Sequence, residues 1–280
     1  MYSTTTLSTH STVASSGSIE DLSLSDEENV SFEKVSKFGR IIVKAPNAIS
    51  QLTLEKANRE IDKLPAYDFK SKGNRIREVD LVASEYSKDA QRPTKVTFDA
   101  DGKLSDTEEF EKKFAPHTDS IKAMCKEALQ TMGQKLNWKN ISIEVRCNVL
   151  RYPFTPEQTQ ICNMAWHKDG CNLSMTTLLS PYYQHGNGFT GGELSFAQDS
   201  LFSPGVPVAG TIKTLEYEKP GDGFIFDGLK SLHKVENMHL LHEIKDGEEI
   251  VERLLLLCFA WPSIGDVITL SEALGKENLV

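Results

Sequence analysis

The chain has 280 residues, enough to bury a substantial core in one or two domains. Its 31 Lys and Arg residues against 40 Asp and Glu residues give a net charge of −9, which disfavours a protein that wraps a nucleic-acid backbone. No run of about 18 apolar residues is present, and the N-terminus lacks a basic segment followed by an apolar one, so we expect neither a membrane span nor a secretory signal. Five cysteines without C-x-x-C spacing disfavour a disulfide framework and favour a reducing compartment. We therefore predict a cytoplasmic protein.

The first 140 residues are predicted to support a fold rather than to perform chemistry. Residues 1–30 are rich in Ser and Thr and end in an acidic patch, so we expect a disordered tail. Residues 31–140 form a helical and irregular support region, in which 66–104 is charged and irregular. Its expected elements are a strand over 40–44, a helix over 52–64, a helix that begins at the capping box Ser105–Glu108, and a helix with an apolar stripe from Ile121 to Leu136.

From Ile141 onward the hydrophobic period changes to two, which is typical of half-buried strands. Short strand-like runs then follow one another without an intervening helical stripe. These runs cover residues 141–149, 173–179, 193–197, 211–217, 223–226, 233–237 and 250–259. Many short strands without crossover helices indicate an antiparallel sandwich or barrel. We predict a mostly β protein with N-terminal helices: a double-stranded β-helix (jelly-roll) core over 141–265, buttressed by helices, and a C-terminal tail over 266–280.

A candidate metal site begins at His167 and Asp169, two residues apart. In extended chain, side chains at i and i+2 point to the same face, so both can bind one ion. Two ligands are too few for a catalytic site, and His233 is the candidate for the third. Two histidines and one carboxylate with open positions suit non-haem Fe(II) and its O₂ chemistry. The alternative is an accidental H-x-D tripeptide, because short motifs often match by chance.

Arg253 opens the strongly apolar run that ends at Phe259. A guanidinium is expensive to bury without an anion, and its planar fork suits a carboxylate. A small dicarboxylate cosubstrate that also chelates the metal would satisfy it. The other interpretation, a strand-edge arginine paired with Glu252 or a surface acid, stays open at this point.

Six elements in a fixed order resemble the Fe(II)- and 2-oxoglutarate-dependent dioxygenases, particularly the prolyl 4-hydroxylase-like branch. The resemblance covers about Ile143 to Trp261. The elements are Val149-Leu150-Arg151-Tyr152, His167-Lys168-Asp169, Gly191-Gly192-Glu193-Leu194-Ser195-Phe196, Lys219-Pro220-Gly221-Asp222-Gly223-Phe224-Ile225-Phe226, His233-Lys234-Val235, and Arg253 on its apolar strand. The resemblance implies that His167, Asp169 and His233 bind Fe(II), and that Arg253 binds the distal carboxylate of 2-oxoglutarate, with O₂ as cosubstrate.

Two departures from the family pattern concern the ligands. The distance along the chain from His233 to Arg253 is long, and the insert 237–249 looks like an extended hairpin. His239 and His242 lie in that insert, but neither has the His-x-Val pattern, so His233 is kept. This branch often has a tyrosine on the strand after the iron-binding aspartate that contacts the distal carboxylate. Here that strand carries Thr176 and Thr177, either of which is a substitute, and Tyr152 is a further candidate for this contact.

The resemblance implies a hydroxylase that couples C–H oxidation to the conversion of 2-oxoglutarate into succinate and CO₂. We expect a protein or peptide side chain as substrate, with proline first, and the same chemistry on a free amino acid or other small molecule as the alternative. The segments 153–165 and 66–104 are expected to frame the substrate. An inactive jelly-roll binding module and a cupin-like metal protein are the other hypotheses. A nucleobase substrate is disfavoured, because Phe259 stands where a second arginine would be needed.

Overall fold

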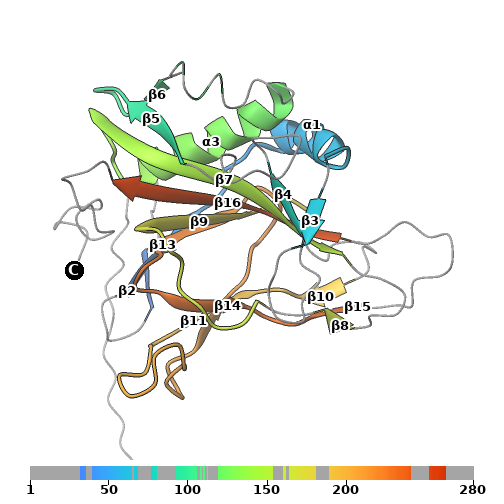
Figure 1. The fold of residues 1–280 in the computed structure, drawn as a ribbon, viewed down its shortest axis with the longest axis vertical. Helices are drawn as coiled ribbons and strands as arrows, with labels where there is room; N and C mark the ends of the chain where they lie inside the picture. The colour runs from blue at the N-terminus through green and yellow to red at the C-terminus, as the bar shows by residue number, and fades with distance from the viewer. Residues whose placement is uncertain are drawn as a thin grey trace, which may run out of the picture. The chain divides into compact units, whose positions relative to one another are not determined.

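The fold is organised around a ten-stranded antiparallel sheet, the major sheet, in the order β1-β2-β13-β9-β16-β7-β4-β3, with β5 on the same edge of β7 as β4, and β6 paired with β5 (Figure 1). The computed structural model describes residues 32–35, 40–64, 66–68, 77–80, 93–105, 108, 110, 112, 119–153, 160–161, 164–180, 189–240 and 252–262. The strands of the major sheet are β1 (Phe32–Val35), β2 (Arg40–Ala45), β3 (Ala66–Asp68), β4 (Arg77–Asp80), β5 (Thr94–Phe98), β6 (Leu104–Ser105), β7 (Ile141–Pro153), β9 (Leu173–Leu178), β13 (Gly223–Asp227) and β16 (Glu252–Pro262).

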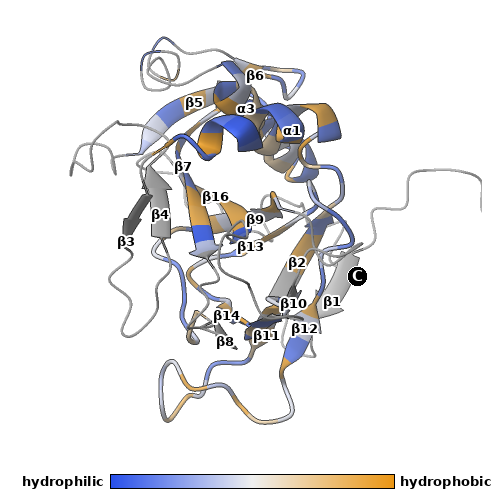
Figure 2. Ribbon diagram, turned by 90° about the vertical axis from the view of Figure 1, so that its right-hand side faces the viewer, coloured by the Kyte–Doolittle hydropathy of each residue, from blue (hydrophilic) through white to orange (hydrophobic). Residues whose placement is uncertain are grey.

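Two three-stranded sheets lie on the other side of the fold from the helices. One has the order β12-β11-β14, and the other has the order β10-β15-β8. Their strands are β8 (Gln160–Ile161), β10 (Phe189–Gly191), β11 (Leu194–Ala197), β12 (Lys213–Leu215), β14 (Leu232–Val235) and β15 (Met238–Leu240). Helices α1 (Gln51–Ile61) and α3 (Asp119–Lys135) lie against the opposite face of the major sheet, so the order of layers is helices, major sheet, small sheets (Figures 1 and 2).

Strand β16 is apolar on both faces because both faces of the major sheet are covered. Leu254, Leu256 and Cys258 belong to the core cluster shared with α1 and α3. Leu255 belongs to a second cluster, which fills the space between the major sheet and β11, β12 and β14. Side chains alternate along a strand, so Arg253 points to the same inner space as Leu255. The inner space between the sheets therefore receives a charged group at one end of β16.

Helix α1 begins where its sequence provides a cap. The Ser50 hydroxyl accepts a hydrogen bond from the Thr53 N–H, which satisfies one of the free donors of the first turn. The buried face of α3 is the stripe from Ile121 to Met132 that its spacing indicates. Within the described ranges, no helix is long and apolar enough to span a membrane.

The predicted fold class is confirmed: the protein is mostly β, with curled antiparallel sheets and helices near the N-terminus, as in a jelly-roll. Every strand predicted from 141 onward is present, and β2, α1 and α3 match their predictions. The segment 66–104 differs from the irregular structure expected, since β3, β4, β5 and β6 include residues from it. The charged sequence of this segment does not indicate strands, because these strands are short and lie toward the edge of the sheet.

Some predictions fall outside the described residues. These are the tails 1–30 and 266–280, most of the helix expected from Ser105, most of the segment 153–165, and His242. The division of the chain into domains stays a prediction.

Candidate metal centre

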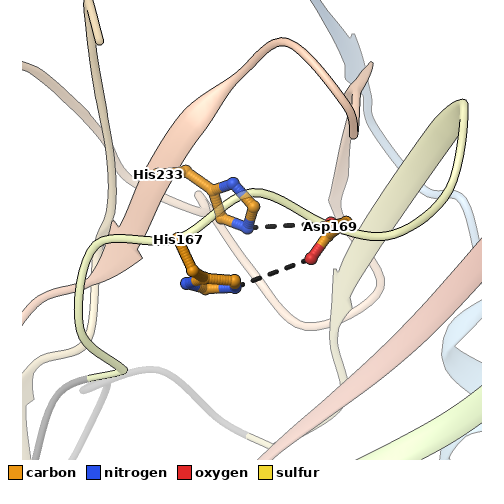
Figure 3. Close-up of side chains that lie close together, drawn as sticks. All are labelled: His167, Asp169 and His233. Atoms are coloured by element: carbon orange, nitrogen blue, oxygen red, sulfur yellow. Dashed lines mark ion pairs between the residues drawn. The ribbon is translucent and has the colours of Figure 1, made fainter. Parts of the chain in front are cut away.

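Backbone pairing brings His167 and His233 together. The His167 N–H donates to the His233 carbonyl at 2.9 Å, and the His233 N–H donates to the His167 carbonyl, also at 2.9 Å. Residues paired in this way lie directly opposite each other, with their side chains on one side of the ladder. The two imidazole rings consequently lie 4.2 Å apart between centroids (Figure 3). Residues 66 positions apart in the chain thus become neighbours through two main-chain hydrogen bonds.

Asp169 completes a group of three ligands. Its N–H donates to the Gly228 carbonyl at 3.0 Å, in the turn between β13 and β14. Its Oδ1 lies 3.5 Å from His167 Nε2, and its Oδ2 lies 3.7 Å from His233 Nε2 (Figure 3). The three donor atoms all lie within 4.8 Å of one another, and the described part of the chain contains no other such group of His, Cys, Asp or Glu. A single ion can bridge atoms at this spacing.

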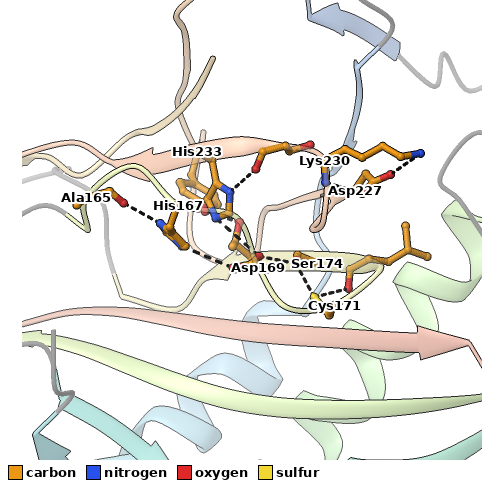
Figure 4. A network of polar contacts seen from close by, with 12 residues as sticks. Ala165, His167, Asp169, Cys171, Ser174, Asp227, Lys230 and His233 are labelled. Atoms are coloured by element: carbon orange, nitrogen blue, oxygen red, sulfur yellow. Dashed lines mark hydrogen bonds and ion pairs between the residues drawn. The ribbon is translucent and has the colours of Figure 1, made fainter. Parts of the chain in front are cut away.

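Both imidazoles are set in the tautomer that binds metal through Nε2. His167 Nδ1 lies 2.7 Å from the Ala165 carbonyl, and His233 Nδ1 lies 2.9 Å from the Ser231 carbonyl (Figure 4). A carbonyl only accepts, so each Nδ1 carries the hydrogen and each Nε2 keeps its lone pair. In each case the carbonyl belongs to the residue two positions earlier. The same local geometry therefore orients two ligands from different parts of the chain.

The charges of the three groups differ with their surroundings. Burial between the sheets, against Phe196 and Phe226, lowers the pKa of His233 to about 4, so this ring is neutral and ready to bind metal. Burial alone would lower the pKa of His167 and raise that of Asp169. For His167, the hydrogen bond to Asp169, the Ala165 carbonyl and the Asp169 charge together outweigh burial, so its pKa is raised. For Asp169, the hydrogen bonds from His167 and Ser174 and the attraction of both histidines together outweigh burial, so its pKa is lowered. Asp169 is therefore ionised, and His167 offers its Nε2 lone pair to a metal ion in its neutral form.

A hydroxyl and a thiol stand behind the carboxylate. Ser174, on β9, donates a hydrogen bond to Asp169 Oδ2 (Figure 4). The Cys171 sulfur lies 3.0 Å from the Ser174 hydroxyl oxygen. The thiol is buried and contacts the residue that holds Asp169.

Arg253 is fully buried with two nitrogen atoms unpaired. Its Nη2 donates to the Gly192 carbonyl, while Nε and Nη1 have no hydrogen-bond partner. The Tyr152 hydroxyl, on the residue directly opposite Arg253 in the β7–β16 ladder, is also buried and unpaired. The interpretation of Arg253 as a surface ion pair is wrong, because Glu252 pairs with Arg151 instead. A buried cation and a phenol, both unsatisfied, are the donors that a carboxylate would use.

The two glycines of the Gly191-Gly192 motif make room for this arginine. Both have φ of +85°, a conformation that favours glycine. A Cβ on Gly192 would lie 2.9 Å from Arg253 Nε, and a Cβ on Gly191 would meet the Asn237 carbonyl oxygen. Gly192 lies four residues before Phe196, so the Cα atoms of Gly192 and Phe196 are at most ~14 Å apart. Phe196 is in turn paired with His233. Tyr152, which Arg253 contacts, belongs to the same core cluster as Phe196 and Phe226, which His233 contacts, so the guanidinium and the ligand group border one interior cluster.

Thr176 lies in this interior, and its Oγ1 accepts a hydrogen bond from the Tyr217 hydroxyl at 2.7 Å. Tyr217 was not identified from the sequence as a candidate site residue. Its ring lies 5.9 Å from the Arg253 Cζ, and the Tyr152 ring lies 5.4 Å from it. Thr177 points to the other face of β9, as alternation requires. His239, the alternative ligand, is on β15 and is exposed.

Comparisons with known proteins give only distant matches. No protein-family model matches the chain, and no curated protein matches it. One similar solved structure is IDO from Bacillus thuringiensis, with 14% identity, a TM-score of 0.46, and coverage of 80% of this chain and 93% of that chain. Another is an oxidoreductase of the 2OG-Fe(II) oxygenase family from Burkholderia pseudomallei, with 15% identity, a TM-score of 0.45, and coverage of 80% and 86%. A third is a prolyl hydroxylase from Trichoplax adhaerens in complex with a hypoxia inducible factor peptide, with 8% identity, a TM-score of 0.46, and coverage of 79% and 83%. Matches at this level carry no substrate or activity over to this chain.

Proposed function

We propose that this protein is an Fe(II)- and 2-oxoglutarate-dependent dioxygenase that hydroxylates a C–H bond. The observation that carries the proposal is the combination of two sites that face one interior. One site has three converging candidate ligands, with both Nε2 atoms facing the Asp169 carboxylate. The other is a fully buried arginine with two unpaired nitrogen atoms. A metal site that worked without a cosubstrate would not need a buried arginine. A buried arginine without any anion to bind would destabilise the folded protein.

In this proposal His167, Asp169 and His233 hold Fe(II) and leave its other positions open. The ion, when bound, supplies the redox chemistry that couples O₂ to decarboxylation of 2-oxoglutarate and hydroxylation of the substrate. Arg253 binds the distal carboxylate, and the unpaired Tyr152 hydroxyl donates a second hydrogen bond to it. Phe196 and Phe226, which pack against His233, help to keep water from the ion. Thr176 already accepts from Tyr217, so we assign it to the pocket wall.

We further propose a protein or peptide side chain as substrate, with proline as the leading choice from the sequence resemblance. A free amino acid or other small molecule is the alternative within the same chemistry. A binding module without turnover is the alternative outside it. The cytoplasmic location and the low expectation of nucleic-acid binding stay predictions from the sequence.

Succinate formation from 2-oxoglutarate tests the proposal without knowledge of the substrate. The full chain, supplied with Fe(II), ascorbate and O₂, is expected to release succinate slowly, because uncoupled turnover does not need the substrate. His233→Ala should abolish succinate formation and weaken metal binding. Arg253→Met should abolish succinate formation while metal binding is retained. Absence of both 2-oxoglutarate binding and turnover in the native chain would leave the binding module as the better explanation.

A further inference from the structure

The loop between β11 and β12, residues 198–212, holds an unusual set of exposed apolar side chains. In the described parts of the chain, six large apolar side chains are exposed, and four of them are in this loop. Leu201 and Phe202 at its tip are 89% and 97% exposed. Val206 and Ile212 complete the set. Exposed apolar groups gathered in one place mark an interaction site more often than single ones do.

Hydrogen bonds within the loop hold the tip in place. The Ser200 N–H donates to the Val206 carbonyl, and the Val206 N–H donates to the Ser203 carbonyl, both at 3.0 Å. The Ser200 hydroxyl accepts from the N–H groups of Phe202 and Ser203. Because these bonds order the backbone before any partner arrives, the apolar tip loses little conformational entropy on binding.

The loop is attached to the candidate metal centre at two points. It leaves β11 at Ala197, one residue after Phe196, which is paired with His233. Near its start, Asp199 forms an ion pair with Lys168 at 2.5 Å. Lys168 stands between the ligands His167 and Asp169. The loop therefore projects from the end of the small sheet where the metal ligands lie, below β11 and β12 in Figure 2.

The size and charge of the tip narrow the choice of partner. Leu201, Phe202 and Val206 together offer roughly 400 Å² of apolar surface, given ~200 Å² for an aromatic side chain and less for an aliphatic one. A stable interface needs about 800 Å² from each partner, so this tip is too small for a permanent dimer. Asp199 is the only charged residue in the loop, so the tip lacks the lysines and arginines that attract a membrane surface. A small apolar contact beside a reaction centre fits a weakly held, transient partner.

We infer that the 198–212 loop is a docking surface for the polypeptide substrate and contacts an aliphatic or aromatic side chain several residues from the hydroxylated one. The inference rests on the proposed function for the reaction, and it narrows the substrate class to peptides with an apolar residue at a fixed distance. An extended peptide advances ~3.3 Å per residue, so a handful of residues spans the path from the ligand group to the tip. Leu201 and Phe202 are almost wholly exposed and are not among the candidate metal ligands, so the docking surface sets specificity rather than chemistry.

The test uses an array of immobilised 15-residue peptides with a central proline, in which Leu and Phe are moved through every other position on a Gly-Ser background. The full chain is loaded with Mn(II) and 2-oxoglutarate to suppress turnover. Three forms are compared: the native chain, the double variant Leu201→Ser with Phe202→Ser, and Leu52→Ser, which replaces an exposed leucine on α1. We expect the native chain and Leu52→Ser to select peptides with an apolar residue at one offset from proline. The double variant should bind the same peptides with an affinity at least about tenfold lower.

Several results would overturn the inference. They are equal binding of the same peptides by the double variant, an absence of any apolar offset preference in the native chain, and a native dimer in sedimentation that the double variant converts to a monomer. Loop-dependent binding to phosphatidylserine vesicles would also overturn it. Succinate formation separates this test from that of the proposed function. Peptide selection without succinate formation would support the docking surface and contradict the proposed dioxygenase function. Succinate formation without peptide selection would support the dioxygenase function and contradict the docking surface.

Discussion

Replacement of Arg253 by methionine should leave the ligand-free protein as stable as before, or more stable. Removal of a fully buried large side chain ordinarily costs about 3–5 kcal/mol. Here two buried nitrogen atoms without partners are removed as well, and each costs about 1–3 kcal/mol in the native protein. The variant loses the hydrogen bond to Gly192 and the ring contacts with Tyr152 and Tyr217, which together are worth about 2–4 kcal/mol. Methionine fills most of the volume.

The two nitrogen atoms give a gain of about 2–6 kcal/mol and the lost contacts a cost of about 2–4 kcal/mol, so near the midpoints of these ranges the free energy of unfolding is unchanged or raised by up to ~2 kcal/mol. In a domain of this size that is a rise in Tm of at most ~4–8 °C. The native protein loaded with Mn(II) should gain about 2.7 kcal/mol from 2-oxoglutarate at 100 times its Kd, and the variant should gain nothing. Thermal unfolding with and without 2-oxoglutarate measures both quantities, and Mn(II) affinity serves as the control. A variant that loses 3 kcal/mol or more, together with a native protein that does not respond to 2-oxoglutarate, would refute the cosubstrate role and make Arg253 structural.

Three further predictions concern the ligand group and its supports. Ser174→Ala should weaken Co(II) binding about tenfold in anaerobic titrations, because Asp169 loses the hydroxyl that orients it, and Ser174→Thr should restore most of the affinity; equal affinities would exclude this positioning role. In the metal-free protein, the pKa of His233 falls from 6.5 in the unfolded chain to about 4 in the folded chain, so its contribution to stability is complete above pH 6.5 and is lost as the pH falls toward 4. The loss amounts to about 3 kcal/mol at ~1.4 kcal/mol per pH unit, and urea unfolding of His233→Gln should lack this part of the acid sensitivity; identical pH profiles for the two proteins would contradict it. Gly192→Ala should raise the Kd for 2-oxoglutarate at least tenfold in calorimetric titrations while Mn(II) binding is kept, because its Cβ would displace Arg253 and φ of +85° disfavours alanine; an unchanged Kd would show that the arginine tolerates the shift.

The candidate metal ligands were readable from the sequence because ligand chemistry belongs to residue type and short spacing. His167 and Asp169 share a face in any extended chain, and His233 begins a strand after a tight turn. The structure brings all three together as predicted. The roles of Tyr152 and Thr176 toward a cosubstrate stay predictions, although the unpaired hydroxyl of Tyr152 supports the first.

Residues that act through a neighbouring strand left no signal in the sequence. Ser174 resembles any serine in a strand, and only its placement beside Asp169 makes it a hydrogen-bond donor to a ligand. Tyr217 follows β12 and meets Thr176 of β9, 41 residues earlier in the chain. The short strands β8 and β10 were missed for a related reason, because two or three residues carry no measurable period and are ordered by their partners, whereas β15 lies within the hairpin expected over 237–249.

The sequence by itself determined the class of fold, the three candidate ligands and the presence of one arginine in an apolar strand, because periodicity and side-chain chemistry are local properties. Tertiary structure alone decided that this arginine is buried with unpaired nitrogen atoms, since its partners depend on which strand lies opposite β16. It also decided that the apolar loop 198–212 stands beside the ligands, through the ion pair of Asp199 with Lys168. Contacts between distant segments depend on strand order and register, and neither is contained in the period of any one strand.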